Sequence, residues 1–280
     1  MPDCSFHDAV SPAAWQASLR LGFADDAGTT RLVERAHSGP LRVQKALYPE
    51  GPAICHAIVL HPPGGVVGGD TLAIDVHAGP NAHAFLTTPG AAKWYRANGR
   101  QSRQRVRIAA DAGAALEWMP QETIFFNDAD VRIEHEVELG PGARYIGSEI
   151  LCFGRRASGE TFASGAIRQR TSIRLAGKLV WWEQGVLVAG GPAMVSPLGL
   201  GGASVCATLI AVGPPAPPAL LAAMRARDER LALSQLKSVF VARYLCDDSE
   251  AARRAITQVW QALRPHLLGC DAVIPRIWTT

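Results

Sequence analysis

The chain has 280 residues, and 48% of them are hydrophobic, which is enough to bury a substantial core in one large domain or two smaller ones. Its net charge of +3 at pH 7 is not concentrated in a lysine or arginine run, and no aromatic RNA-binding motif is present, which argues against nucleic acid as a partner. Charged residues make up 19% of the chain, below the roughly 25% of ordinary soluble domains, so we expect another protein to cover part of the surface.

The cysteines and the apolar stretches predict the compartment. The six cysteines are scattered and contain no C-x-x-C pair, so neither a disulfide framework nor a structural zinc site is expected. The first ten residues lack a basic segment followed by an apolar one, and the longest apolar stretch, Ala203 to Val212, is too short to span a bilayer. We expect a cytoplasmic protein without a membrane partner.

From about Trp15 to Gly213 the hydrophobic pattern has a period of two, which is typical of strands with one buried face. In the segment from Val131 to Leu139, apolar residues and His135 alternate with charged residues. The segment from Ile167 to Leu175 alternates in the same way. The sequence therefore predicts a mostly β protein, and His135 on an apolar face is expected to be a packed side chain.

An internal repeat lies within this β part. Each copy has an alternating strand, a turn with glycine followed by alanine, and a second strand; the copies are Ile74 to Pro89, Val106 to Pro120 and Val131 to Glu149. A spacing near thirty residues fits hairpins stacked into a solenoid-like structure. Three ordinary hairpins of a sandwich fit equally well. We expect an irregular, β-helix-like stack of sheets.

The C-terminal part changes character after a nearly uncharged, glycine-rich segment, Gly185 to Gly213, which is expected to be buried, covered or poorly ordered. The prolines from Pro214 to Pro218 interrupt the chain. Beyond them the patterns predict a helix over 219–227, a strand over 239–245 and a helix over 249–268, whose capping candidates are Asp247, Asp248 and Ser249. We expect the β part, about 15–213, and the helical part, about 219–280, to form one domain spanning 1–280.

The segment His61-Pro-Pro-Gly-Gly-Val-Val-Gly-Gly-Asp70 combines two prolines with two glycine pairs. Prolines fix φ, and glycines permit positive φ and close backbone packing, so this segment predicts a rigid corner. It does not match the P-loop order or the G-x-G-x-x-G pattern, which argues against a nucleotide site.

Several carboxylates lie in apolar surroundings, where each needs a partner, a proton, water or a cation. Glu160 follows Arg155 and Arg156, which predicts an ion pair. Glu149 and Glu183 have no neighbouring cation in the sequence, so a water-filled or metal-visited interior is an alternative to a structural role. Oxygen ligands would hold nickel weakly and release it readily.

The candidate metal-route residues are therefore Glu149, Glu183, Asp70, Glu160 and His61. His61 would add a nitrogen ligand, although a packed histidine is the alternative. If the repeats stack, Thr87, Glu122 and Glu149 are expected at equivalent corners along one side of a cavity. For contact with a partner protein the candidates are Trp260, Arg264, His266 and Trp278, with core packing as the alternative.

Catalytic motifs are missing from the sequence. It contains no G-x-S-x-G and no H-E-x-x-H, and Cys55 and His56 are neighbours that would point to opposite faces of a strand. The sequence therefore carries no catalytic signal, which by itself does not decide against an enzyme. A β-fold hydrolase or a carbohydrate-binding module that uses the acidic residues is the alternative.

Ordered blocks along nearly the whole chain resemble one protein family. They are GPLRVQ at 39–44, YPEG at 48–51, HPPGGVVGGD at 61–70, TTPGAAKWYR at 87–96, LEWMPQETIFF at 116–126, GRRASGE at 154–160, and the ending from Arg264 to Trp278. The sequence is thereby similar to the urease accessory protein UreD, also called UreH. Ser148 is a departure, because members of this family often have tryptophan at that position.

The resemblance implies a mostly β, β-helix-like fold with two helices toward the C-terminus. It also implies a scaffold that binds apo-urease and UreF, recruits the GTPase UreG through UreF, and passes nickel through an interior tunnel toward the urease active site. No tightly bound cofactor is implied, because nickel would be held only in transit.

Overall fold

The computed structural model describes residues 14–279, which form two large β-sheets and three α-helices. The seven-stranded sheet has the order β14 (Lys178–Val188), β13 (Gly165–Leu175), β11 (Ala129–Leu139), β8 (Ser102–Ala110), β5 (Thr71–Ala78), β1 (Gln16–Asp26) and β2 (Thr29–Ser38). The main path of the ten-stranded sheet is β16 (Leu231–Leu236), β17 (Val239–Cys246), β15 (Val205–Val212), β12 (Arg144–Phe153), β9 (Ala115–Met119), β6 (His83–Thr87), β4 (Ile54–Leu60) and β3 (Arg42–Val43). Two short strands, β7 (Ala92–Trp94) and β10 (Thr123–Phe125), continue it beside β12.

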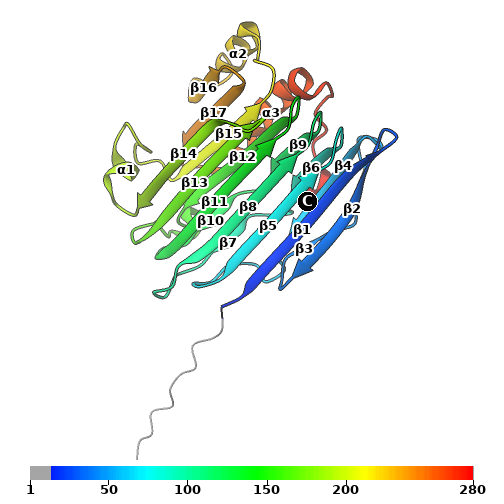
Figure 1. The fold of residues 1–280 in the computed structure, drawn as a ribbon. Helices are drawn as coiled ribbons and strands as arrows, with labels where there is room; N and C mark the ends of the chain where they lie inside the picture. The colour runs from blue at the N-terminus through cyan, green and yellow to red at the C-terminus, as the bar shows by residue number, and fades with distance from the viewer. Residues whose placement is uncertain (1–13, 280) are drawn as a thin grey trace, which may run out of the picture.

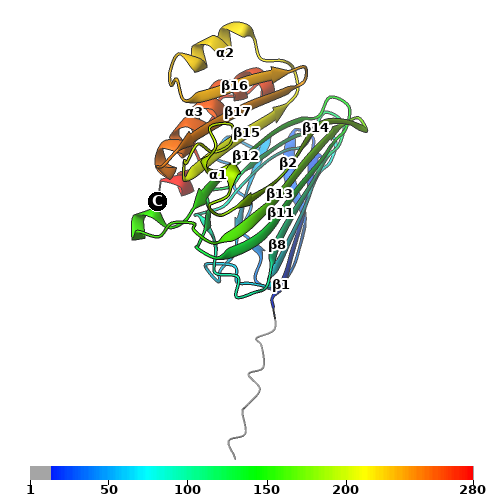
Figure 2. The same ribbon diagram turned by 90° about the vertical axis from the view of Figure 1, so that its left-hand side faces the viewer.

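The two sheets and the helices form three layers (Figures 1 and 2). One apolar core lies between the two sheets, and a second lies between the ten-stranded sheet and the helices. The helices are α1 (Pro192–Val195), α2 (Pro218–Arg225) and α3 (Ser249–Leu268), with short 3-10 turns at Arg156–Ser158 and Arg276–Trp278. The β part and the helical part therefore share the ten-stranded sheet, one face of which contributes to each core.

The internal repeat builds the central strands, and its stacking confirms the predicted solenoid-like architecture. In each copy the first strand joins the seven-stranded sheet and the second joins the ten-stranded sheet. Strands β5, β8 and β11 pair in parallel with one another, and so do β6, β9 and β12. The prediction that each copy is a hairpin is therefore wrong. Alternation identifies the buried face of a strand but does not identify the strand with which it pairs.

The repeated turns explain the alanines that follow their glycines. Ala82, Ala114 and Ala143 are all at least 97% buried where the chain passes from one sheet to the other. Hydrogen bonds continue the stack through the turns: Ala115 N–H donates to the carbonyl of Ala82, and Arg144 N–H donates to that of Ala114, both at 2.9 Å. A side chain larger than a methyl group has little room at these bends.

The C-terminal elements follow the predicted pattern closely. Helix α3 has the predicted bounds, and the carboxylate of its N-cap, Asp248, accepts the N–H of Glu250 at 2.9 Å. Its apolar face packs on β12, β15 and β17 and forms most of the second core. Helix α1 and the loop after it occupy part of the nearly uncharged segment, in which Met194 and Leu200 are buried but Leu198 is 98% exposed.

The segment from His61 to Asp70 forms the predicted corner before β5. Gly64 and Gly69 have positive φ, at 77° and 96°. Gly68 lies against backbone, because a Cβ there would overlap the carbonyl of Ala97 and stand 2.8 Å from that of Arg100. Within residues 14–279, no helix is long and apolar enough to cross a membrane.

Candidate functional site

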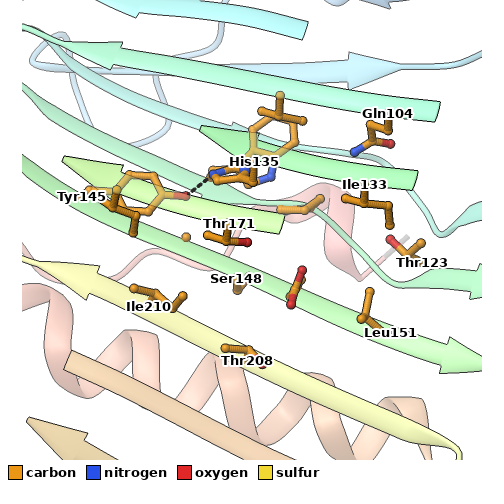
Figure 3. A pocket seen from close by; sticks show the side chains of 16 residues that line it. Gln104, Thr123, Ile133, His135, Tyr145, Ser148, Leu151, Thr171, Thr208 and Ile210 are labelled. Atoms are coloured by element: carbon orange, nitrogen blue, oxygen red, sulfur yellow. Dashed lines mark hydrogen bonds between the residues drawn. The ribbon is translucent and has the colours of Figure 1, made fainter. Parts of the chain in front are cut away.

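A narrow cavity of about 70 Å³ lies in the middle of the molecule, between the two sheets (Figure 3). More of its lining is apolar than polar, and the polar part comes mainly from neutral side chains. The side chains include Gln104, Thr123, His135, Tyr145, Thr171 and Thr208. A space of this size and polarity holds a few water molecules, so the cavity is suited to small hydrated species.

Two wider pockets adjoin this narrow cavity. One, of about 210 Å³, shares Gln104, Trp118, Pro120 and Thr123 with it and extends to His61 and the glycine corner. The other, of about 590 Å³, shares Glu149, Leu151 and Thr208 with it and extends to Glu183 on β14. The narrow cavity therefore shares walls with both wider pockets, and His61 lies in one of these pockets and two carboxylates lie in the other.

Glu149 stands where the narrow cavity meets the larger pocket. It projects from β12 toward the seven-stranded sheet, where the side-chain amide of Gln169 donates to both of its oxygens, at 2.6 and 2.5 Å. Burial raises the pKa of Glu149 to about 7, and the negative charge of Glu183 adds to this rise, while the amide of Gln169 and the charge of Arg243 oppose it. Glu149 is therefore poised to gain or lose a proton near neutral pH.

Glu183 lies on β14, opposite Glu149, and its ion-pair partner comes from a distant part of the chain. The guanidinium of Arg243, on β17, donates a hydrogen bond to the carboxylate of Glu183. The two side chains are 39% exposed for Glu183 and 45% for Arg243, so the pair is open to solvent. Arg243, Thr208 and Glu149 form one row across β17, β15 and β12. The ion pair therefore bridges the two sheets across the larger pocket.

His135 is a packed histidine, as predicted. One ring nitrogen is 2.8 Å from the hydroxyl of Tyr145, and both side chains line the narrow cavity (Figure 3). Burial lowers the pKa of His135 to about 4, so the ring is neutral at pH 7. Glu149 is accordingly the side chain whose charge sets the polarity of this cavity near neutral pH.

His61 and Asp70, at the glycine corner, differ in their surroundings. His61 lines the pocket of about 210 Å³, and burial lowers its pKa, an effect that the charge of Asp70 opposes. Asp70 is 97% buried, and its two oxygens accept the N–H groups of Trp15, at 2.8 Å, and Val67, at 3.1 Å. The geometry thus gives Asp70 a structural partner on each oxygen, and His61 stays a predicted metal-route residue.

The remaining acids lie away from these three spaces. Glu160 forms the predicted ion pair with Arg155, at 2.7 Å, on a surface loop. Glu122 pairs with Arg253 of α3 at 3.2 Å. The hydroxyl of Thr87 donates to the carbonyl of Met119 at 2.6 Å and accepts the indole N–H of Trp278.

The prediction that Thr87, Glu122 and Glu149 line one side of a cavity is therefore wrong. Thr87 and Glu122 contact the helical layer, whereas Glu149 points between the sheets. Of the four acids and one histidine assigned to a metal route, the structure brings Glu149 near Glu183 and His61 near Asp70, and it places Glu160 apart from both pairs.

The predicted partner-contact residues divide into buried and accessible ones. Trp260 and Arg264 have no exposed surface. The indole N–H of Trp260 donates to Glu117 at 2.6 Å, and the guanidinium of Arg264 binds both Glu117 and Glu50. Both residues belong to the second core instead of an accessible interface, because their polar groups donate hydrogen bonds to carboxylates within this chain.

His266 and Trp278 remain accessible. His266 is exposed, with one ring nitrogen 2.9 Å from the carbonyl oxygen of Pro215. Trp278 is half-buried beside the rings of Phe85 and Trp260. Contact between these two side chains and a partner stays a prediction.

The buried network around Arg264 also explains Cys55 and His56. Cys55 faces the core between the sheets, while His56 lies on the other side of β4, 2.6 Å from Glu50. They point apart, as predicted. Burial alone would raise the pKa of Glu117, but hydrogen bonds and charges from His83 and Arg264 outweigh burial and lower it. These charges hold α3 onto the ten-stranded sheet.

Two residues of the site were missed by the sequence analysis, Arg243 and Gln169. Arg243 is the only charged residue between Val239 and Leu245, and alternation places it on the same face as both ends of that segment. Gln169 likewise lies on the apolar face of the segment from Ile167 to Leu175. A lone polar residue on the buried face of a strand was the available signal in both cases.

The donor set at Glu149 and Glu183 consists of two carboxylates, an amide and a hydroxyl. Over residues 14–279, no three His, Cys, Asp or Glu side chains are arranged to hold a metal ion together. Five described cysteines are free, and Cys206, which lines the same pocket, has its pKa raised to about 12 by burial and by the charge of Glu149. Such a site suits brief, weak contact with a cation and not storage.

Comparison with known proteins identifies the family. The sequence matches the family described as UreD urease accessory protein over residues 16–279. It is 62% identical over 271 residues to the urease accessory protein UreD of Janthinobacterium sp. (strain Marseille), covering 95% of this chain and 92% of that protein. It is 53% identical over 278 residues to the UreD of Nitrosospira multiformis, covering 97% of this chain and all of that protein. The chain belongs to the UreD family of urease accessory proteins.

Proposed function

We propose that this protein is a urease maturation factor that is not itself an enzyme. It binds apo-urease and UreF, recruits the GTPase UreG through UreF, and conducts nickel through its interior toward the urease active site. Nickel is cargo in this scheme and not a resident cofactor. The names of the relatives support the link to urease, and the partners follow from the family resemblance described above.

The observation that carries the proposal is the set of three adjoining cavities between the sheets. In its narrow part, neutral polar side chains such as Gln104, Thr171 and Thr208 interrupt an apolar lining, and they offer a hydrated cation hydrogen-bonding groups without binding it strongly. Its larger pocket holds Glu149 and Glu183, whose charges favour a cation there. A route with strong ligands at every step would retain nickel, whereas conduction requires that each step be easily reversed.

Protonation of Glu149 is coupled in this scheme to the passage of the cation. With a pKa of about 7, it carries a proton in part of the population at neutral pH. Arrival of a divalent cation favours the charged carboxylate and so releases that proton. Arg243 already occupies one oxygen of Glu183, so a cation that uses Glu183 must displace the guanidinium or share the carboxylate with it.

The test is the nickel content of urease matured in cells that express its subunits, the other accessory proteins and either the parent chain or a variant. We expect Glu149→Gln and Glu183→Gln to lower nickel per urease at least about threefold while complexes with UreF and urease still form. The matched control is Glu138→Gln on the outer face of the seven-stranded sheet, whose side chain is 61% exposed.

The outcomes separate the parts of the proposal. Normal nickel loading with both glutamine variants rejects the interior route. Loading that is equally high in cells lacking this chain altogether rejects the maturation role itself. Complexes that fail to assemble with a glutamine variant reassign that acid to structure, which a thermal melt of the purified complex identifies independently.

A further inference from the structure

Strand β14 is an open edge of the seven-stranded sheet. Its eleven residues pair only with β13, in antiparallel register, among the strands that the structure describes. Every second residue of such a strand directs its N–H and C=O away from the sheet, where they remain available for another strand. Figure 1 places this edge on the left of the molecule, beside α1.

The outer face of β14 is apolar apart from Gln184, which lies opposite Arg170 of β13. Leu179, Trp182, Val186 and Val188 are between 48% and 54% exposed there. On the neighbouring strand the same face carries Arg168, Arg170 and Arg174, and the face stays charged across β11. The apolar stripe is thus confined to the edge strand, where a further strand would cover it.

The opposite edge of the same sheet is protected in the usual way. Strand β2 carries the exposed charges of Arg31, Glu34 and Arg35, which discourage pairing with other chains. Strand β14 has no proline, and its only charged residues are Lys178, at its start, and Glu183, which turns toward Arg243. The two edges therefore differ in their readiness to accept a strand.

This edge is also the rim of the larger pocket. Glu183, Gln184 and Gly185 of β14 line that pocket, and so does Leu198, which is 98% exposed. A Cβ on Gly185 would meet no atom within 4 Å, so the rim is open at this point. A polypeptide bound along β14 would lie beside Glu183, and Glu149 lies one strand further in, against Gln169 of β13.

We propose that β14 is a docking strand to which an extended segment of apo-urease adds edge-on, with apolar side chains covering Trp182 and Val186. The backbone hydrogen bonds would fix the register, and the alternating apolar side chains would provide specificity. The choice of apo-urease rests on the proposed function, because the protein that receives the cargo must lie at the mouth of the cavity. The open backbone groups require a strand as the occupant.

The direct test is amide hydrogen exchange in the complex of this chain with UreF, before and after addition of apo-urease. We expect exchange in 178–188 to slow at least about tenfold on binding, because new interstrand hydrogen bonds protect every second amide. The control segment is β2, at 29–38, where exchange should change less than about twofold.

Substitutions give a second, independent measurement. Trp182→Lys combined with Val186→Lys places two charges on the docking stripe, and we expect apo-urease to bind at least about tenfold more weakly. Val33→Lys is the matched control, because Val33 is 64% exposed on the other edge of the same sheet. It should leave binding within about twofold of the parent chain. Thermal melts of each variant with UreF verify that the fold is retained.

The outcomes are distinguishable from those of the proposed function. If the parent complex does not bind apo-urease at all, the proposed function fails. If it binds apo-urease but 178–188 stays unprotected, the docking strand is rejected while the proposed function stands. Protection of 178–188 before urease is added, together with a doubled particle mass, overturns the proposal in favour of pairing between two copies of this chain.

Discussion

Arg243 and Glu183 are 60 positions apart in the chain, yet their side chains meet across the gap between the two sheets. Each comes from the inner face of a strand near the edge of its sheet, so the ion pair connects the two sheets across the larger pocket. Glu149 lies in the same row as Arg243 and responds to both charges. The ion pair therefore contributes to the electrostatic potential in the larger pocket, at the end of the proposed route.

Replacing Arg243 with methionine should alter the route more than the stability. The pair is half exposed, so its loss is expected to cost no more than about 1 kcal/mol of unfolding free energy. The pKa of Glu149 should rise further, because the opposing charge is gone. The measurements are a thermal melt and the nickel content of matured urease. Arg174→Met is the control, since Arg174 is 47% exposed beside Glu138 on the outer face; an equal effect of both substitutions on nickel would contradict the assignment.

Stability should depend on the ionisation of Glu149 between pH 4.5 and about 7. Its pKa is raised from 4.5 in the unfolded chain to about 7 in the fold, so the native state binds the extra proton in this window. The contribution of Glu149 is fully present below pH 4.5 and is lost as the pH rises through 7. Glu149→Gln should abolish this loss, which we put at about 3 kcal/mol. Denaturant unfolding of the UreF complex at several pH values measures this loss. If the free energy of unfolding depends on pH equally in the parent chain and in the variant, the raised pKa of Glu149 is disproved.

His135 should act in the opposite direction over an overlapping range. Its pKa falls from 6.5 to about 4 on folding, so the unfolded chain binds the extra proton between these values. Its contribution is therefore present above pH 6.5 and is lost as the pH falls through 4, by about 3 kcal/mol in total. In the parent chain the two slopes partly cancel. His135→Gln should make stability fall more clearly with rising pH, and the same titration that serves Glu149 reveals it.

Loss of Arg264 should unfold the C-terminal helix from the sheet. Its guanidinium is completely buried between Glu50 and Glu117, and its removal leaves two carboxylates without their main cation. We expect Arg264→Met to cost about 3–5 kcal/mol. Arg264→Lys should restore little, because an ammonium group does not reproduce the forked geometry. The control is Arg254→Met in the exposed pair with Glu250, and a melt of each UreF complex compares them.

The glycine corner offers a purely steric test. Gly68→Ala forces a methyl group into the carbonyl of Ala97, which is backbone and does not move cheaply. We expect a loss of about 2 kcal/mol or more and a large fall in melting temperature. Gly90→Ala is the control, because a Cβ at Gly90 meets no atom within 4 Å. Equal melting temperatures for the two variants would show that the corner yields easily.

The sequence was most informative where the interactions are local. The bounds of α3 were predicted correctly because Asp248 caps it and the apolar residues recur at helical spacing. The strands of the repeat were also located, and so was the ion pair between Glu160 and Arg155, which are five positions apart. In each case the residues that decide the structure are neighbours in the chain.

Long-range partners were beyond the reach of the pattern. The pairing of Glu183 with Arg243 depends on how two sheets face each other, and alternation leaves that unspecified. For the same reason the copies of the repeat were predicted to be hairpins, because alternation does not show that their two strands join different sheets. Trp260 and Arg264 are residue types that are common at interfaces, but their hydrogen-bond partners lie within this chain. Glu117 is 143 positions before Trp260, and Glu50 is 214 positions before Arg264.

That last separation has a consequence for the order of synthesis. Glu50 and Glu117 are made early, with the strands that later enclose them, but the guanidinium that neutralises both arrives only when α3 leaves the ribosome. Until then the nascent ten-stranded sheet has two acids on the face that α3 will cover, and that face cannot close. Assembly of this chain is therefore completed from its C-terminal end, and a product truncated before α3 leaves Glu50 and Glu117 with only His56 and His83 as partners.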